Sequence, residues 1–376
     1  MRAPGLGGAR LVSLIDAFGG AGELVRASPS TLRQAGLKDE AVEALSHPDP
    51  ARLKQDLAWL AEPQNHLLTW RDERYPALLR DIPSSPAALF VRGDPDALWQ
   101  PQLAVIGSRN PTVGGRENAR DFAAELGRQG LTITSGMAEG IDSEAHRGAL
   151  DAGGLTVAVL GTGPDMVYPA SGRQLAERIA AQGALVTEFP PGTEAKREHF
   201  PSRNRIISGL SLGVLVIEAG LRSGTLITAR LAGDQGREIF ALPGSIHNPM
   251  AKGCHRLIRD GARLVESVSE IMEEVASMAG RLAVDLERCV GESRLDPAAA
   301  RPKLSREAGD EPPWATDPEY RRLWDCLGHD PRPVDAIIEE SGLTAQSVSA
   351  MLLLLELRGM VEAHAGGAYS RKKKRP

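Results

Sequence analysis

Short apolar runs, each followed by a loop and a helical stretch, constrain this 376-residue chain more than any other feature. The runs at 103–106, 131–134, 155–160 and 213–217 are rich in aliphatic residues, as strands buried on both faces of a parallel sheet are. Alternating strands and helices predict an α/β fold with a right-handed, mostly parallel sheet covered by helices on both faces. Ligands of such sheets bind outside the carboxyl ends of the strands. We therefore expect the loops after these four runs to converge on one crevice.

The loop after the run at 213–217 has the composition of an anion site. Residues 223–225 read Ser-Gly-Thr and open a predicted helix, where unpaired backbone N–H groups and the positive end of the helix dipole favour a phosphate. Upstream, residues 203–205 read Arg-Asn-Arg and supply two cations and an amide. Two arginines at this spacing also suit an ordinary solvated helix face, but the neighbouring loop leads us to predict phosphate contacts.

The motifs that are missing narrow the chemistry. The loop at 107–112 reads GSRNPT rather than GxGxxG, so NAD or FAD binding by the usual route is not expected, and no GxxxxGK[ST] indicates a P-loop ATPase. Cys254, Cys289 and Cys326 are widely spaced and form no CxxC motif, so we expect reduced structural thiols, with neither a disulfide framework nor a zinc site. No cofactor or metal is therefore expected.

A few single residues have the types used in hydrolysis. Ser135, Asp142, His146 and Glu188 are such residues, but no GxSxG nucleophile elbow accompanies them, so we predict no catalytic residues. We interpret His146 as a helix residue that packs or bonds to backbone. Glu188 and Glu218 stand at the ends of predicted strands, where we expect them to orient the loops or the arginines.

Charge and composition limit how the chain can meet nucleic acid. A net charge of −5 and a pI near 6.0 are unusual for a non-specific duplex binder, so any DNA site must be local. An aromatic content of 4% argues against a long stacking platform. No apolar run has the length of a membrane span, about 18 residues, and the first residues lack the apolar core of a signal peptide. We expect a cytoplasmic protein.

Two flanking segments differ in composition from the sheet region, which we place at 67–277. Residues 1–66 read as short helices separated by glycine-containing turns, a pattern that resembles helix-hairpin-helix or small sterile-alpha-motif-like bundles. Whether this bundle contacts DNA phosphates or another protein stays open. Residues 278–319 are rich in Pro, Ala, Arg and Glu and read as a linker.

The C-terminal segment, 320–376, predicts three helices and a hairpin, which resembles a winged helix. Its third predicted helix, at 344–358, carries many leucines and one cation near its end, whereas a helix that reads a DNA groove needs polar and basic side chains on its exposed face. We therefore expect a protein-contact or auxiliary module. The basic tail at 371–375 is expected to act as a weak electrostatic tether for DNA.

Six motifs in a fixed order resemble the DNA-processing protein A family, DprA or Smf. They are GSRNPT from residue 107, SGMAEGID from 135, AVLGTG from 158, FPSRNRIISGLS from 200, EAGLRSGTLITA from 218 and ALPG from 241. The match covers residues 75–270 and extends more weakly into both flanks. The resemblance implies an extended Rossmann-like fold, sequence-independent binding of single-stranded DNA, and a homodimer. It also implies that the protein loads RecA recombinase onto incoming strands during natural transformation, with single-strand-binding protein as a further partner.

The resemblance also implies particular residues. The implied DNA-binding residues are Gly107, Ser108, Arg109, Ser135, Gly136, Met137, Gly140, Ile141, Asp142, Arg203, Asn204, Arg205, Ser223, Gly224 and Thr225. The expected dimer contact, in the last part of the sheet domain, involves Leu257, Ile258 and Leu264.

This chain departs from the family pattern at three places. Glu139 stands where the family commonly has arginine, Ser202 where a basic residue often precedes RNR, and Cys254-His255 where Thr-Asn usually follows glycine. The first two remove positive charge near the predicted site, which should weaken binding without abolishing it. An alternative is a nucleotide-monophosphate phosphoribohydrolase-like enzyme of the same superfamily. The motif of those enzymes, PGGxGTxxE, is matched here only by residues 222–225.

Overall fold

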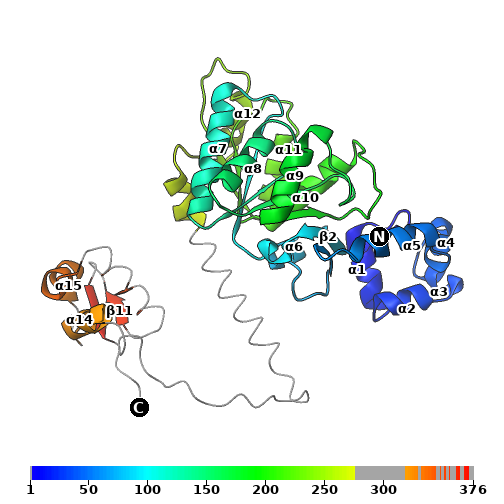
Figure 1. The fold of residues 1–376 in the computed structure, drawn as a ribbon, viewed down its shortest axis with the longest axis horizontal. Helices are drawn as coiled ribbons and strands as arrows, with labels where there is room; N and C mark the ends of the chain where they lie inside the picture. The colour runs from blue at the N-terminus through cyan, green and yellow to red at the C-terminus, as the bar shows by residue number, and fades with distance from the viewer. Residues whose placement is uncertain are drawn as a thin grey trace, which may run out of the picture. The chain divides into compact units, whose positions relative to one another are not determined.

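The chain divides into two compact units, one within residues 1–295 and the other within residues 296–376. A computed structural model describes residues 2–275, 318–328, 332–343, 348, 351–352, 355, 361–364 and 368–371. The first unit contains the N-terminal helices and the large sheet (Figure 1).

The first unit is built on a nine-stranded sheet, as far as the described residues show. Its strands, in sheet order, are β1 (Asn65–Thr69), β2 (Ala88–Gly93), β6 (Ala184–Thr187), β5 (Thr156–Val159), β4 (Thr132–Ser135), β3 (Gln102–Ile106), β7 (Gly213–Val216), β8 (Glu238–Ala241) and β9 (Arg263–Leu264). The seven strands from β6 to β9 pair in parallel. β1 and β2 extend the sheet in antiparallel pairing. The predicted α/β fold with a mostly parallel sheet is confirmed.

The strand order reverses at β3. From β3 the chain adds β4, β5 and β6 on one side and then returns to add β7 on the other, so that β3 pairs with both β4 and β7. Loops that leave the carboxyl ends of two strands at such a switch point diverge and leave a crevice between them. The crevice that the sequence predicts therefore lies between the loops after β3 and β7.

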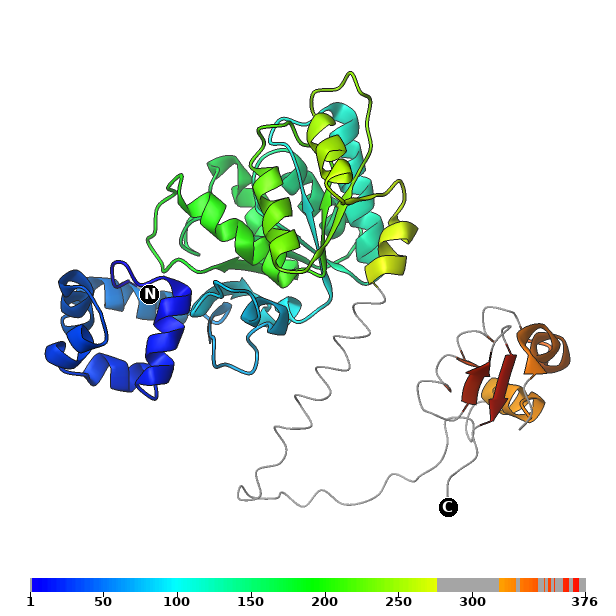
Figure 2. The same ribbon diagram turned by 180° about the vertical axis from the view of Figure 1, so that it is seen from behind.

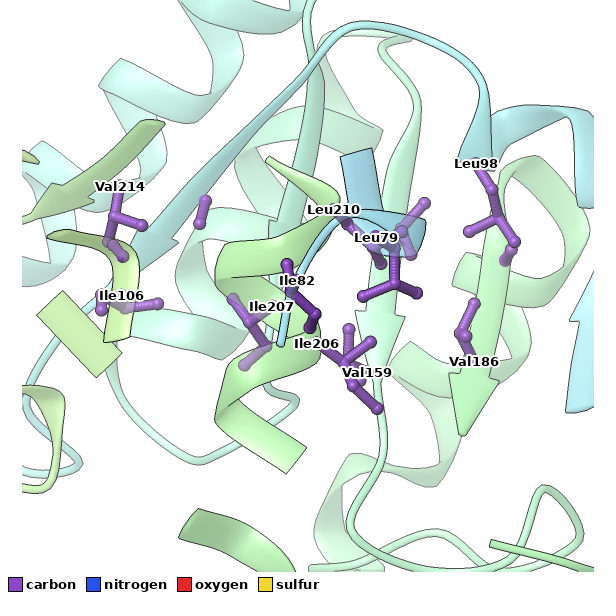
Figure 3. Close-up of a cluster of buried hydrophobic side chains, with 14 of the residues drawn as sticks. Leu79, Ile82, Leu98, Ile106, Val159, Val186, Ile206, Ile207, Leu210 and Val214 are labelled. Carbon is purple, nitrogen blue, oxygen red and sulfur yellow. The ribbon is translucent and has the colours of Figure 1, made fainter. Parts of the chain in front are cut away.

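Helices cover both faces of the sheet. They are α6 (Ala77–Arg80), α7 (Val113–Arg128), α8 (Ile141–Asp151), α9 (Arg173–Gln182), α10 (His199–Leu210), α11 (Thr225–Asp234) and α12 (Lys252–Arg259), with two 3-10 turns, η1 (Pro95–Leu98) and η2 (Ala170–Gly172). Alternate residues of the strands face opposite cores. Val214 packs with α10, α11 and α12 residues, and Leu215 packs with α7 and α8 residues. Figure 3 shows the first of these cores around Ile206, Ile207 and Leu210 of α10.

Five short helices form the N-terminal region, which gathers to one side of the sheet (Figure 2). They are α1 (Gly8–Ala17), α2 (Ala21–Arg26), α3 (Pro29–Gln34), α4 (Asp39–Ser46) and α5 (Pro50–Leu60). Two of these helices begin with the expected signals, because Ser28 caps α3 and Asp49 caps α5, each followed by proline at the first helical position. Leucines from α1, α2 and α3 form a separate small core. The predicted helical region is present, and its first following strand begins at Asn65.

The second unit has helices against a small sheet. Its elements are α14 (Pro318–Cys326), α15 (Val334–Ser341), β10 (Arg332–Pro333), β11 (Val361–His364) and β12 (Ala368–Arg371). β12 pairs antiparallel with both β10 and β11. The β11–β12 pair is the hairpin that the sequence predicts in this segment, at 361–370. The predicted linker, except for its last residues, lies outside the described residues, as do most of the predicted helix at 344–358 and the tail after Arg371.

Among the described residues, no helix is both long enough and apolar enough to cross a membrane.

Candidate nucleic-acid interface

A cavity of about 860 Å³ opens at the carboxyl edge of the sheet. The loops after β3, β4, β5, β6 and β7 all contribute to its lining, together with the first turns of α10 and α11. Residues that line it from these different segments include Arg109, Ala138, Tyr168, Arg197, Asn204 and Arg222. The structure therefore brings together the loops whose convergence the sequence predicts.

Three arginines on separate loops give the cavity its exposed positive charge. Arg109 follows β3, Arg197 precedes α10 and Arg222 follows β7, and all three are exposed. Within the described part of the chain, none of the three guanidinium groups has a hydrogen-bonding or carboxylate partner. Guanidinium groups that lack a protein carboxylate are available to pair with phosphate.

Aromatic rings line the same opening. Tyr168, which is 55% exposed, has its ring centroid 5.6 Å from that of Phe200. The Arg109 guanidinium carbon lies 5.9 Å from the centre of the Phe200 ring. An exposed and a half-buried aromatic ring beside cations that lack a carboxylate partner suit a single strand, whose bases stack on the rings while its phosphates pair with the cations.

The floor of the cavity holds two buried ionisable side chains, those of Arg203 and Asp142. Arg203 is 4% exposed, and its Nη1 donates to the backbone carbonyls of Gly136, at 2.6 Å, and Val159. The Asp142 carboxylate accepts from the N–H groups of Gly136 at 3.2 Å and Ala138 at 3.3 Å. Burial lowers the pKa of Arg203 to about 10, so it stays charged at neutral pH, and burial raises the pKa of Asp142. Arg203 thus lines the cavity but is already bonded to the protein.

Arg205 is not brought to the cavity. Its guanidinium makes two hydrogen bonds to Glu188, at 2.6 and 2.7 Å, and one each to the carbonyls of Ser84 and Ser202 at 2.8 Å. The reason is helical geometry. Arg203 and Arg205 both lie in α10, where two residues apart means a rotation of about 200° around the axis. Of these two arginines predicted to contact phosphate, Arg203 therefore lines the cavity and Arg205 does not.

The glycines of the predicted phosphate loops serve mainly close packing. A Cβ at Gly136 would lie 2.7 Å from the Arg203 guanidinium, and one at Gly107 would lie 2.5 Å from the Ile141 side chain. Gly140 has φ +84°, and its Cβ would lie 2.4 Å from the Ser108 carbonyl. A Cβ at Gly224, by contrast, would meet nothing within 4 Å. Gly224 is therefore the predicted loop glycine that leaves open space at the cavity.

Several of the predicted DNA-binding residues, with hydroxyl or apolar side chains, hold the loops together by contacts within the protein. Thr225 donates its hydroxyl to the Gly107 carbonyl at 2.9 Å, and Ser223 caps the N–H of Thr225 at 3.2 Å, so the loops after β3 and β7 are tied together. Ser135 donates to a backbone carbonyl of β3 at 2.7 Å. Three of the predicted DNA-binding residues have fully buried side chains, namely Ser135, Met137 and Ile141. None of these three lines the cavity among the residues described.

Glu218 orients the loop after β3, as expected from its position. Its carboxylate accepts from the N–H of Thr112 at 2.9 Å, the Thr112 hydroxyl at 2.7 Å and the Asn248 amide at 3.2 Å. Glu188 orients Arg205 in the pair described above. Both carboxylates are thus occupied by the protein.

His146 is a structural residue. Its Nδ1 lies 2.7 Å from the Thr156 hydroxyl, which gives its own proton to the Ile133 carbonyl at 2.7 Å. Because that hydroxyl has only one proton, Nδ1 must be the donor of the first bond. Burial lowers the pKa of His146 to about 3, so the ring is neutral at physiological pH.

Cys254 and Cys326 are buried free thiols, and burial raises the pKa of Cys254 to about 11. Cys289 lies outside the described residues. In the described ranges, no group of three or more His, Cys, Asp or Glu side chains is placed to hold a metal ion.

The sequence reasoning did not single out four residues at the opening, Arg197, Arg222, Tyr168 and Phe200, as site residues. A signal was present for the arginines, since Arg222 directly precedes the Ser-Gly-Thr loop and Arg197 stands in the loop before Phe200. Searching every loop at the carboxyl edge for cations, rather than the helix starts alone, would have found both.

Comparisons with known proteins agree with this architecture. The family model described as DNA recombination-mediator protein A matches residues 66–276, and that of the DprA winged helix domain matches residues 307–367. Protein Smf of Escherichia coli is 42% identical over 339 residues, covering 89% of this chain and 85% of that protein. DNA processing protein DprA of Streptococcus pneumoniae is 43% identical over 203 residues, covering 54% and 72%.

Two solved structures are similar. DNA processing protein A from Streptococcus pneumoniae superposes with a TM-score of 0.65 at 36% identity, covering 73% of this chain and 95% of that one. The structure concerned with the single-stranded DNA binding mode of DNA processing protein A from Helicobacter pylori superposes with a TM-score of 0.52 at 27% identity, covering 57% and 96%. The matched motifs, sheet and winged-helix unit show that the chain belongs to the DNA recombination-mediator protein A family, whose members include DprA and Smf.

Proposed function

We propose that this chain binds single-stranded DNA without sequence preference in the cavity and catalyses no covalent reaction. The observation that carries the proposal is the set of three exposed arginines beside the Tyr168 and Phe200 rings. Phosphates would pair with the arginines and bases would stack on the rings, neither of which depends on base identity. The similar structure of DNA processing protein A from Helicobacter pylori concerns its single-stranded DNA binding mode, which supports single-stranded DNA as the ligand here.

The central test replaces single arginines. Arg109→Ala or Arg222→Ala should weaken binding of a labelled oligothymidine about tenfold to hundredfold, the loss of one charge-assisted contact of roughly 1.5–3 kcal/mol. The salt slope should also fall by about 0.7 per lost phosphate contact. Fluorescence anisotropy over a salt series measures both quantities. Thermal melting of each variant separates lost contacts from lost structure.

Arg128→Ala and Arg178→Ala are the matched controls. Both remove one positive charge, and both residues pair with carboxylates on helix exteriors, Glu125 at 3.0 Å and Asp151 at 2.7 Å. If the folded controls weaken binding as much as Arg109→Ala does, the protein binds DNA over a diffuse electrostatic surface and the cavity is not the site.

The proposal that the chain catalyses no reaction is supported by the hydrogen bonds that its carboxylates near the cavity already accept from the protein. Glu218 accepts three hydrogen bonds from the protein, and Asp142 is bonded to backbone N–H groups. A nucleotide phosphoribohydrolase would need a carboxylate free to act on its substrate. Incubation with labelled nucleoside monophosphates, oligonucleotides and a divalent metal tests this. Turnover that Glu218→Gln or Asp142→Asn abolishes would establish the enzyme instead.

The same proposal assigns the chain a role in recombination. It would deliver the bound strand to RecA recombinase during natural transformation, with single-strand-binding protein as a further partner. The family description of a recombination mediator supports this role. Strand exchange by RecA on DNA coated with single-strand-binding protein, with and without this chain, is the direct assay. No stimulation would contradict the role.

We also propose a homodimer formed through the last part of the sheet domain. Leu264 is 45% exposed on β9, the edge strand, whereas Leu257 and Ile258 are partly buried against the core. Leu264 is therefore the residue expected to contribute most to the contact. Sedimentation should show a dimer at micromolar concentration, and Leu264→Lys should shift it toward monomer. A wild-type monomer would contradict the dimer.

The proposal also includes four domain boundaries. They define a helical domain at 1–66, a sheet domain at 67–277, a linker at 278–319 and a winged-helix-like domain at 320–376. Limited proteolysis, which cuts exposed linkers first, tests these boundaries.

A further inference from the structure

The loop at 188–198, between β6 and α10, brings Arg197 to the rim of the cavity. Its turn at 190–193 contacts two other parts of the first unit, the N-terminal helical region and the loop after β5. Both parts hold the turn through hydrogen bonds.

The N-terminal helical region reaches the turn through Arg2. The Arg2 guanidinium donates to the backbone carbonyl of Pro191 at 2.8 Å and pairs with Asp56 of α5, at 2.9 Å from Nε and 2.5 Å from Nη2. The side chains of Arg2 and Asp56 are only 27% and 19% exposed. Next to Asp56, Gln55 packs so closely on Gly192 that a Cβ there would lie 2.7 Å from the amide nitrogen.

The loop after β5 holds the same turn. The N–H of Gly192 donates to both carboxylate oxygens of Asp165 at 2.9 Å. The N–H of Gly163 donates to the carbonyl of Thr193 at 2.8 Å. Because this loop also carries Tyr168, the cation and the aromatic ring at the opening share one hydrogen-bonded support.

We propose that the Arg2–Asp56 pair is a positioning device for the DNA cavity. It holds the 190–193 turn and so presents Arg197 at the rim, which lets the N-terminal helices raise the affinity for single-stranded DNA without touching the strand. This role rests on the proposed function, because Arg197 matters only where phosphates bind. Without the pair, binding would have to order Arg197. Ordering one such side chain costs about 0.5–1.5 kcal/mol, which corresponds to a loss of affinity of about twofold to tenfold.

The test is Asp56→Ala, with anisotropy of a labelled oligothymidine as the readout. Removing Asp56 deletes a negative charge, so long-range electrostatics alone would leave DNA binding unchanged or strengthen it. The positioning role predicts the opposite sign, a weakening of about twofold to tenfold. Asp39→Ala is the charge-matched control, because Asp39 pairs with Arg33 at 2.7 Å inside the helical region.

A second arm combines Asp56→Ala with Arg197→Ala. If the pair acts through Arg197, the double variant binds as weakly as Arg197→Ala alone, which is the non-additivity expected of coupled residues. Arg2→Ala removes the contact to the turn without altering α5, and it takes the place of Asp56→Ala in the combination with Arg197→Ala if melting shows that Asp56→Ala is not folded. Because Arg2→Ala also removes a positive charge, its non-additivity with Arg197→Ala, rather than its weakening alone, is the deciding result.

The outcomes separate the two proposals. Wild-type affinity in Asp56→Ala and Arg2→Ala, or an additive loss in the double variant, would overturn the positioning role and leave the cavity as the DNA site. A wild-type chain that does not bind oligothymidine would refute the proposed function itself.

Discussion

The buried ring of His146 gives the protein a defined sensitivity to acid. The pKa of this ring is about 3 in the folded chain and 6.5 as its ordinary value. Between these values the unfolded chain binds a proton that the folded chain does not, so stability falls as pH falls. The slope is about 1.4 kcal/mol per pH unit, which gives a loss of about 2 kcal/mol at pH 5 relative to pH 8.

His146→Gln should remove this loss, because the glutamine amide can still donate to the Thr156 hydroxyl but does not titrate. Urea unfolding at pH 8 and pH 5 measures the difference for wild type and variant. The raised pKa of Asp142 acts with the opposite sign, but it is present in both proteins and cancels in the comparison. His247→Gln is the control, because His247 is exposed and its ring stays in water in both states. An equal acid-induced loss in wild type and His146→Gln would refute the reasoning.

Two further predictions follow from charged residues of the sheet domain. Arg205→Ala should destabilise the folded chain by about 3 kcal/mol, the lower end of the cost of breaking a buried pair, because it leaves Glu188 unpaired where both side chains are under 20% exposed. Urea unfolding measures this, and an unchanged midpoint together with weakened DNA binding would restore Arg205 as a phosphate contact. Glu139 is exposed beside the cavity-lining Ala138, so Glu139→Gln should tighten oligothymidine binding by about 1.5-fold to fivefold at low salt. Anisotropy checks it against Glu62→Gln, and an equal gain in both would mean that only net charge matters.

Much of the sheet was predictable from the sequence, and its antiparallel edge was not. The central strands are runs of aliphatic residues bounded by loops, so each run identifies its own strand without knowledge of its neighbours. β1 and β2 lie in a stretch with several prolines that reads as an irregular approach to the sheet. Their existence depends on pairing β2 with β6, about ninety residues later in the chain, and no local pattern encodes that partner.

The location of the site was predictable to the level of loops but not of side chains. Switch-point topology identifies the edge, and the four loops do meet there. Whether an arginine is free to bind a phosphate depends on its tertiary partners. Arg205 of α10, for example, pairs with Glu188 in the loop after β6. The sequence also does not distinguish the roles of the glycines. Gly136 and Gly224 stand in similar motifs, but of these two only Gly224 borders open space.

The cation under the cavity differs from those around its mouth in its access to counterions. Arg109, Arg197 and Arg222 stand in solvent, where dissolved salt screens a charge over about 10 Å at 0.1 M and about 3 Å at 1 M. Arg203 is enclosed by protein, so mobile ions cannot surround it in the same way. Raising the ionic strength therefore weakens the attraction of the three exposed arginines before that of Arg203. A strand bound as proposed would keep the long-range attraction of this buried cation in concentrated salt, although the Arg203 guanidinium is itself already bonded to the protein.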